Sequence, residues 1–282
     1  MRVGVIGGTG LYDLAGLTDA RDVVVDTPLG APSSPIRLGR VRGVEVAFLA
    51  RHGRDHSLLP SEVPYRANAL AFKKLGVERI IAVSAVGSLR AEIAPGDVVV
   101  VDQFLDQTTD RVNTFFGRGV VAHVEFAEPA DADLRRVLVA AVRRVGAPVH
   151  DGGTYVCIDG PMFATRAESR LYGRWGADII GMTNLPEARL MREAGLSIAT
   201  LAMVTDYDSW REDLAGVTAD AIFQVLRANA ERARDIVGHA VEGAAALGPS
   251  RWKNVLANAL VTPLDQVPAE HRPWLDLLLG KT

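Results

Sequence analysis

Two aspartates, Asp206 and Asp208, follow a continuous apolar run that begins at Ala199. Such a run is typical of a parallel strand that is covered on both faces. Acids spaced i, i+2 at the end of a strand point the same way on a pleated backbone, and ligand crevices of open α/β sheets form at these carboxyl ends. The pair is therefore a candidate for sharing protons with a ligand, while a polar loop after a strand is the alternative interpretation.

Residues suited to binding an anion follow other predicted strands. The strand at residues 2–6 leads into Gly7-Gly8-Thr9-Gly10, where backbone N–H groups and the Thr9 hydroxyl could hold a small anion. The glycine spacing does not fit the dinucleotide pattern G-x-G-x-x-G, and a plain tight turn is the alternative. Arg51 and His52 follow another strand and could supply a cation and an imidazole donor to the same anion.

Small hydroxyl and apolar residues complete this set. Ser84 and Ala85 end the predicted strand that starts at Arg79, and Met182 and Thr183 end the one at residues 178–182. The rigid turn at residues 159–163 could present Phe163 to a flat ligand, although a buried core phenylalanine fits equally well. If the sheet is mostly parallel, these strand ends meet at one edge. An anion pocket beside paired carboxylates would suit a nucleoside together with phosphate.

The elements that would position these residues alternate along the chain. Helices are predicted at residues 64–75, 132–145, 166–175, 186–194 and 219–246, between the strands. This order predicts a single α/β domain with a mixed, mostly parallel central sheet flanked by helices. The domain is expected to span residues 1–248, with a tail at 249–282 that packs on the body or on a neighbouring subunit. Residues 104–130 are predicted to be irregular and polar, as lids and binding loops often are.

The composition argues against several other classes of protein. The net charge of −3 over 282 residues offers no footprint for nucleic acid, and no apolar stretch reaches transmembrane length. One cysteine, Cys157, predicts no disulfide and favours a cytoplasmic location. His52 and His56 have an H-x-x-x-H spacing but no helix to align them, so no metal site is expected. A P-loop lysine and a nucleophilic serine elbow are both missing.

Six ordered blocks of this sequence resemble the trimeric purine nucleoside phosphorylases, most closely the members that act on S-methyl-5'-thioadenosine. The blocks are residues 6–11 (I-G-G-T-G-L), 51–56 (R-H-G-R-D-H), 84–90 (S-A-V-G-S-L-R), 160–163 (G-P-M-F), 182–187 (M-T-N-L-P-E) and 205–210 (T-D-Y-D-S-W). The resemblance runs from about Arg2 to the helix near Val241. It implies a phosphorylase-like fold, a homotrimer or a dimer of trimers, no cofactor, and inorganic phosphate as co-substrate.

The resemblance also implies roles for individual residues, with Asp206 and His52 as catalytic residues. Phosphate would be held by Thr9, Arg51, His52, Ser84, Ala85 and Thr183. Met182 would contact the ribose and Phe163 the purine. Asp206 would share a proton with purine N7 as the base leaves, and Asp208 would accept from the 6-amino group. Phosphate would attack C1' through a transition state that is close to an oxocarbenium ion.

Three positions depart from the family pattern, and other functions remain open. Ser84 and Asn184 stand where relatives often have threonine, and Met162 stands where they usually have arginine. The first alternative is a phosphorylase of 6-oxopurine nucleosides or methylthioinosine. The second is a purine-binding protein without catalysis, and the third, an NAD-linked dehydrogenase, is disfavoured by the glycine spacing. Nothing in the sequence separates a 5'-methylthio group from a 5'-hydroxyl.

Overall fold

The computed structural model describes residues 2–8, 11, 16–213 and 218–281, and the strands of this part form one sheet. They are β1 (Arg2–Gly7), β2 (Thr18–Val23), β3 (Ile36–Val41), β4 (Val44–Ala50), β5 (Val77–Ser88), β6 (Val98–Val100), β7 (Gln103–Gln107), β8 (Val149–Asp151), β9 (Thr154–Ile158), β10 (Ile179–Gly181) and β11 (Ser197–Asp206). The main order is β2-β3-β4-β1-β5-β10-β9-β7, and β11 joins β5 to β6, which also pairs with β8. Six of these ten strand pairings are parallel, which confirms the expected mixed, mostly parallel sheet.

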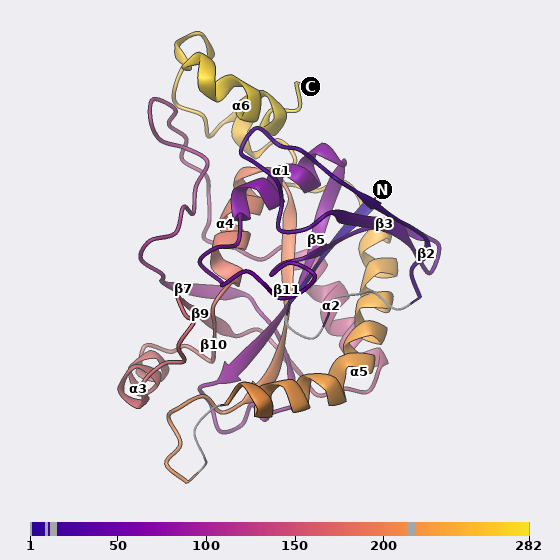
Figure 1. Ribbon diagram of the computed structural model, residues 1–282, viewed down its shortest axis with the longest axis vertical. Coiled ribbons are helices and arrows are strands. Elements are labelled where there is room, and N and C mark those ends of the chain that lie inside the picture. Colours follow the sequence, from indigo (N-terminus) through magenta and orange to yellow (C-terminus); the bar gives the residue numbers. More distant parts are fainter. Residues whose placement is uncertain (1, 9–10, 12–15, 214–217, 282) are drawn as a thin grey trace.

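Helices cover the sheet on both faces (Figure 1). They are α1 (Tyr65–Lys74), α2 (Ala132–Arg144), α3 (Arg166–Arg174), α4 (Asn184–Glu193), α5 (Ala219–Ala246) and α6 (Arg272–Leu278), with short 3-10 turns η1 (Val255–Ala257), η2 (Leu264–Gln266) and η3 (Ala269–His271). Side chains of β5 alternate between two cores, as a strand requires. Ile80 packs with α1, α4 and α6, and Ile81 packs with α2 and α5.

One edge of the central strand β5 changes its pairing partner at the place where the site forms. Its first half pairs with β1 as far as Ala82, and the same strand pairs with β10 from Gly87. Between these two residues no described strand pairs with that edge of β5, while the opposite edge stays paired with β11. The expectation that this strand ends at Ser84 was therefore wrong. Ser84 lies mid-strand, beside a gap in the ladder rather than at a strand end.

Two further expectations about elements are corrected. Residues 104–130 are not irregular throughout, because Gln103–Gln107 form β7 and pair in parallel with β9. The sequence pattern also predicts one strand over residues 150–158, but the structure interrupts it, and β8 and β9 pair with different neighbours. Gly152, in the left-handed region with φ +108°, makes the break, since that conformation cannot continue a strand.

The segment after α5 packs on the body of the same chain. Trp274 of α6 is 4% exposed and lies against Phe115 and Phe116, with ring centroids 6.2 and 6.0 Å away. Leu275 and Leu278 join the core that α1 and α4 share. Across the described residues, no helix has both the length and the apolar character that crossing a bilayer would take.

Candidate active site

One cavity of about 300 Å³ collects the residues singled out from the sequence. It is lined by Arg51, His52, Ser84, Ala85, Phe163, Met182, Thr183, Asp206 and Asp208. The remaining candidate, Thr9, lies outside the described residues. Five elements or their ends supply these side chains: β4, β5, the turn after β9, β10 and β11. The predicted convergence is thus present, while the individual roles stay predictions.

The cavity has a cationic end and an acidic end, and β5 sets the distance between them. At one end the Val83 carbonyl accepts from Arg51 Nη1 at 2.9 Å. At the other, a Cβ placed on Gly87 would be 3.0 Å from Asp206 Oδ1 and 3.1 Å from Asp208 Cβ, so the missing side chain makes room for both acids. Four residues of extended strand span about 13 Å. That length suits a phosphate and a purine joined through a sugar.

Asp206 is the last residue of β11, and its carboxylate is held from two sides. Oδ2 accepts from the Thr205 hydroxyl at 2.6 Å, and Oδ1 accepts from the Asp208 N–H at 2.7 Å. Burial raises the pKa of Asp206, and these hydrogen bonds only partly oppose the rise. A raised pKa brings a carboxyl nearer the working pH of a general acid.

Asp208 reaches the cavity by a different route from the one predicted. It lies beyond β11 in a turn, with φ +45°, rather than two residues along the same strand. Burial raises the pKa of Asp208, and the charges of Asp206 and Glu168 add to the rise. Its Oδ2 atom is buried, and hydrogen bonding from the Ser169 hydroxyl partly opposes the rise in pKa. Because Asp208 lines the cavity, its carboxylate is a candidate acceptor for a ligand N–H.

At the other end, Arg51 is not the free cation that the sequence suggested. The residue is 1% exposed, and Glu187, 2% exposed, faces it from α4. Nε donates to Glu187 Oε1 at 2.5 Å and Nη2 donates to Oε2 at 2.8 Å. Burial opposes the charge on Arg51, but the Glu187 carboxylate outweighs it and raises the pKa of the guanidinium. Glu187 belongs to the block at residues 182–187, yet sequence reasoning assigned it no role.

His52 is a neutral acceptor in this structure, whereas an imidazole donor was expected. Its Nδ1 lies 2.9 Å from the Leu58 carbonyl oxygen, which can only accept, so Nδ1 carries the hydrogen. Burial and, to a smaller extent, the charge of Arg51 lower the pKa of His52 to about 4. Nε2 of the neutral ring can therefore accept from a protonated phosphate oxygen, and it could donate only after taking up a second proton.

The His52 pKa predicts how stability depends on pH. The unfolded ring takes up its proton near pH 6.5 and the folded ring only near 4. Acidification between these values therefore protonates the unfolded chain first, and stability falls by up to about 3 kcal/mol. Urea unfolding at pH 7 and pH 4 should show a smaller loss for His52→Gln than for the wild type. His123→Gln is the control, because His123 is exposed and lies outside the cavity lining, and an unchanged pH dependence in His52→Gln would contradict the assignment.

The wall for a flat ligand is held in place by one residue that the sequence did not reveal. Phe163 is 40% exposed and lines the cavity, so the core alternative for it was wrong. Arg111 donates to the Met182 carbonyl, and to the Asp159 carbonyl at 2.6 Å, so it ties the Phe163 turn to the end of β10. No local pattern marks Arg111, which lies in the segment that was expected to be a loop.

Tyr155 is a second residue that sequence reasoning missed. It is fully buried on β9, and its hydroxyl is 3.4 Å from Ser84 Oγ and 3.5 Å from the Thr183 nitrogen. A Cβ on Gly181 would lie 1.9 Å from this hydroxyl, so only glycine leaves room for it. In the sequence it resembles any core tyrosine. Tyr155 thus contacts both Ser84 and Thr183, the two hydroxyl residues that are predicted to hold phosphate.

Two other kinds of site find little support in the geometry. Within the described ranges, no three His, Cys, Asp or Glu side chains gather as a metal ion would need. His52 and His56 stack instead, with centroids 4.6 Å apart. Cys157 is buried, and burial raises the pKa of its thiol to about 12, so it behaves as a small apolar residue.

Comparisons with known proteins agree with this geometry. The model of the phosphorylase superfamily matches residues 2–242. The S-methyl-5'-thioadenosine phosphorylase of Geobacter sulfurreducens is 51% identical over 99% of this chain and 98% of its own, and that of Thermosynechococcus vestitus is 50% identical over 99% and 98%. These alignments extend through the tail, beyond the region near Val241 where the resemblance was expected to end.

Solved structures show the same likeness. A methylthioadenosine phosphorylase from an antarctic soil metagenomic library has a TM-score of 0.93 and 48% identity, over 98% of both chains. The methylthioadenosine phosphorylase from Schistosoma mansoni in complex with adenine has a TM-score of 0.88 and 36% identity, over 94% of this chain and 99% of that one. This chain therefore belongs to the phosphorylase superfamily, and within it to the S-methyl-5'-thioadenosine phosphorylases.

Proposed function

We propose that this chain phosphorolyses S-methyl-5'-thioadenosine to adenine and 5-methylthioribose 1-phosphate. The observation that carries the proposal is that one cavity has Arg51, Ser84 and Thr183 at one end and two half-buried carboxylates about 13 Å along β5. A phosphate bound at the first end would face C1' of a nucleoside whose purine lies at the second. The activities named for the relatives point to the same reaction.

In this mechanism each group acts where charge develops. A phosphate oxygen forms a bond to C1' while the C1'–N9 bond breaks and its electron pair moves into the purine. Asp206, with its pKa raised by burial, shares a proton with N7 and so stabilises the departing base. N–H donors of Arg51 and hydroxyls of Ser84 and Thr183 orient the phosphate before the reaction, which lowers the cost of reorganisation.

The substrate groups at C6 and C5' match the lining of the cavity. The Asp208 carboxylate, which lines the cavity, would accept from the 6-amino group and would repel the lone pairs of a 6-oxo group. Apolar side chains beside His56 would accommodate a methylthio group better than a hydroxyl. They are Leu58, Leu59, Pro60 and Ile222. The first alternative, a phosphorylase of 6-oxopurine nucleosides, lacks a donor at Asp208.

The setting of the enzyme is part of the same proposal. It works as a cytoplasmic homotrimer with no cofactor other than phosphate as co-substrate, and nucleic acid and membranes are not among its partners. The family resemblance supports the trimer, and the single buried cysteine supports a reducing compartment.

Ultraviolet monitoring of methylthioadenosine with and without phosphate tests the proposal. Adenine release that depends on phosphate is expected, at a kcat/KM well above those for inosine and methylthioinosine. Faster turnover of methylthioinosine would favour the 6-oxopurine alternative. No phosphate-dependent turnover, combined with measurable adenine binding, would favour a purine-binding protein without catalysis.

A further inference from the structure

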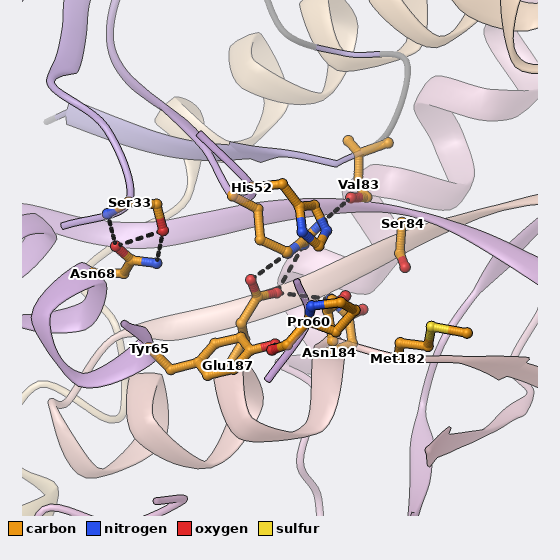
Figure 2. A network of polar contacts seen from close by, with 12 residues as sticks. Ser33, His52, Pro60, Tyr65, Asn68, Val83, Ser84, Met182, Asn184 and Glu187 are labelled. Atoms are coloured by element: carbon orange, nitrogen blue, oxygen red, sulfur yellow. Dashed lines mark hydrogen bonds and ion pairs between the residues drawn. The ribbon is translucent and has the colours of Figure 1, made fainter. Parts of the chain in front are cut away.

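Glu187 is a buried acid at the phosphate end of the cavity that the proposed mechanism does not use. Figure 2 shows its carboxylate extending from α4, with Asn184 on one side and the labelled Val83, His52 and Ser84 nearby. A carboxylate close to a phosphate site repels phosphate, because like charges repel. Its presence at this end of the cavity therefore needs another explanation. Its contacts indicate what that explanation is.

The hydrogen bonds of Arg51 leave it only one way to face a ligand. A guanidinium has five N–H donors in a planar fork. Glu187 takes one on Nε and one on Nη2, and the Val83 carbonyl takes one on Nη1. The two that remain belong one to each terminal nitrogen, and a planar fork of this kind can bind two phosphate oxygens at once. Gly8 leaves the space beside Nη1, since a Cβ there would lie 2.6 Å from it.

Glu187 is itself held by Asn184, one of the positions that depart from the family pattern. The two residues lie three apart in the first turn of α4, so their side chains are neighbours. Asn184 Nδ2 donates to Glu187 Oε2 at 2.8 Å, and Asn184 is fully buried. A threonine could not supply this N–H. Asn184, Glu187 and Arg51 thus form one continuous chain of hydrogen bonds that leads to the cavity wall.

We propose that Glu187 is a positioning residue that fixes the guanidinium plane of Arg51, and that Asn184 fixes Glu187. This inference rests on the proposed function in one respect, because it takes phosphate as the ligand at this end. Without Glu187 the Arg51 side chain could rotate, and phosphate would have to order it on binding. The free-energy cost of that ordering would lower the affinity for phosphate and leave the affinity for the nucleoside nearly unchanged.

The test compares Glu187→Gln and Asn184→Ala with Glu193→Gln. Glu193 is the control, because it is a half-buried acid on the same helix α4, where it accepts from Thr114 and from the Phe115 N–H at 2.7 Å, away from the cavity. We expect Glu187→Gln to raise the KM for phosphate about 10-fold or more, by analogy with groups that orient a ligand-binding side chain. Asn184→Ala should raise it by a smaller factor. The KM for methylthioadenosine should change less than about 3-fold in both.

Binding of inorganic phosphate alone, measured by calorimetry, separates this inference from the proposed function. If the wild type binds phosphate but turns over no methylthioadenosine, the function fails and the Glu187 comparison still stands. Equal changes in both KM values, or a rise in Glu193→Gln as large as that in Glu187→Gln, would show a merely structural role and overturn the proposal. If Glu187→Gln does not fold, Asn184→Ala decides, and an unchanged phosphate affinity there contradicts the chain of hydrogen bonds.

Discussion

Asp206→Asn is expected to lower kcat for methylthioadenosine by about 10²–10⁴-fold, the usual contribution of a general acid or base. Asparagine has nearly the same shape, and its amide can still contact Thr205 and the Asp208 N–H that hold Asp206 now. It cannot share an acidic proton with N7. Hydrogen bonds from Thr205 and from the Asp208 N–H hold Asp206, rather than a cation among the described residues, so the substitution leaves no opposite charge unpaired and the fold should remain intact. Steady-state kinetics at saturating phosphate and thermal unfolding measure the two effects.

A 7-deaza analogue of the substrate provides the control for this prediction. It has a carbon atom in place of N7, so the wild type should bind it and cleave it slowly. Asp206→Asn should then differ little from the wild type with the analogue. If Asp206→Asn keeps the wild-type kcat on methylthioadenosine, Asp206 has no catalytic role. If kcat falls but the variant is unfolded, the loss of activity comes from the loss of stability and not from the missing proton.

Local sequence patterns were sufficient to predict most elements of the fold and nine of the residues that line the cavity. Apolar runs and helix caps predicted the strands and helices, since these depend on residues close together in the chain. Small or polar residues at strand ends marked Arg51, Thr183 and Asp206, because topology brings such ends to one edge. In each case the signal lies within a few residues of the side chain concerned.

The rest of the site depends on contacts between distant segments. Arg51 and Glu187 are 136 positions apart, and Arg111 reaches a carbonyl 71 positions away. No pattern in one sequence shows that two such residues meet. The proton on His52 Nδ1 likewise follows from the position of the Leu58 carbonyl. Sequence reasoning therefore identified part of the cavity lining and missed how the charges and protons of these residues are arranged.

Asp208→Asn is expected to shift the ratio of kcat/KM values for methylthioadenosine and methylthioinosine by about 100-fold toward the 6-oxo substrate. The Asp208 carboxylate lines the cavity and can accept from a 6-amino group. An asparagine amide can also donate to a 6-oxo group, and hydrogen bonds to buried charged groups contribute about 1.5–3 kcal/mol. Asparagine also tolerates the left-handed conformation with φ +45° at this position, so the backbone should not be strained.

Asp208→Gly separates the two parts of this shift. Glycine suits the positive φ and removes the acceptor without adding a donor. Activity on methylthioadenosine should therefore fall in both variants, whereas activity on methylthioinosine should rise in Asp208→Asn alone. An equal rise in Asp208→Gly would show that loss of repulsion, rather than a gained hydrogen bond, admits the 6-oxo group. Unchanged selectivity in both variants would place recognition of C6 elsewhere in the cavity, and Asp208 would then serve only to hold Asp206 through its backbone N–H.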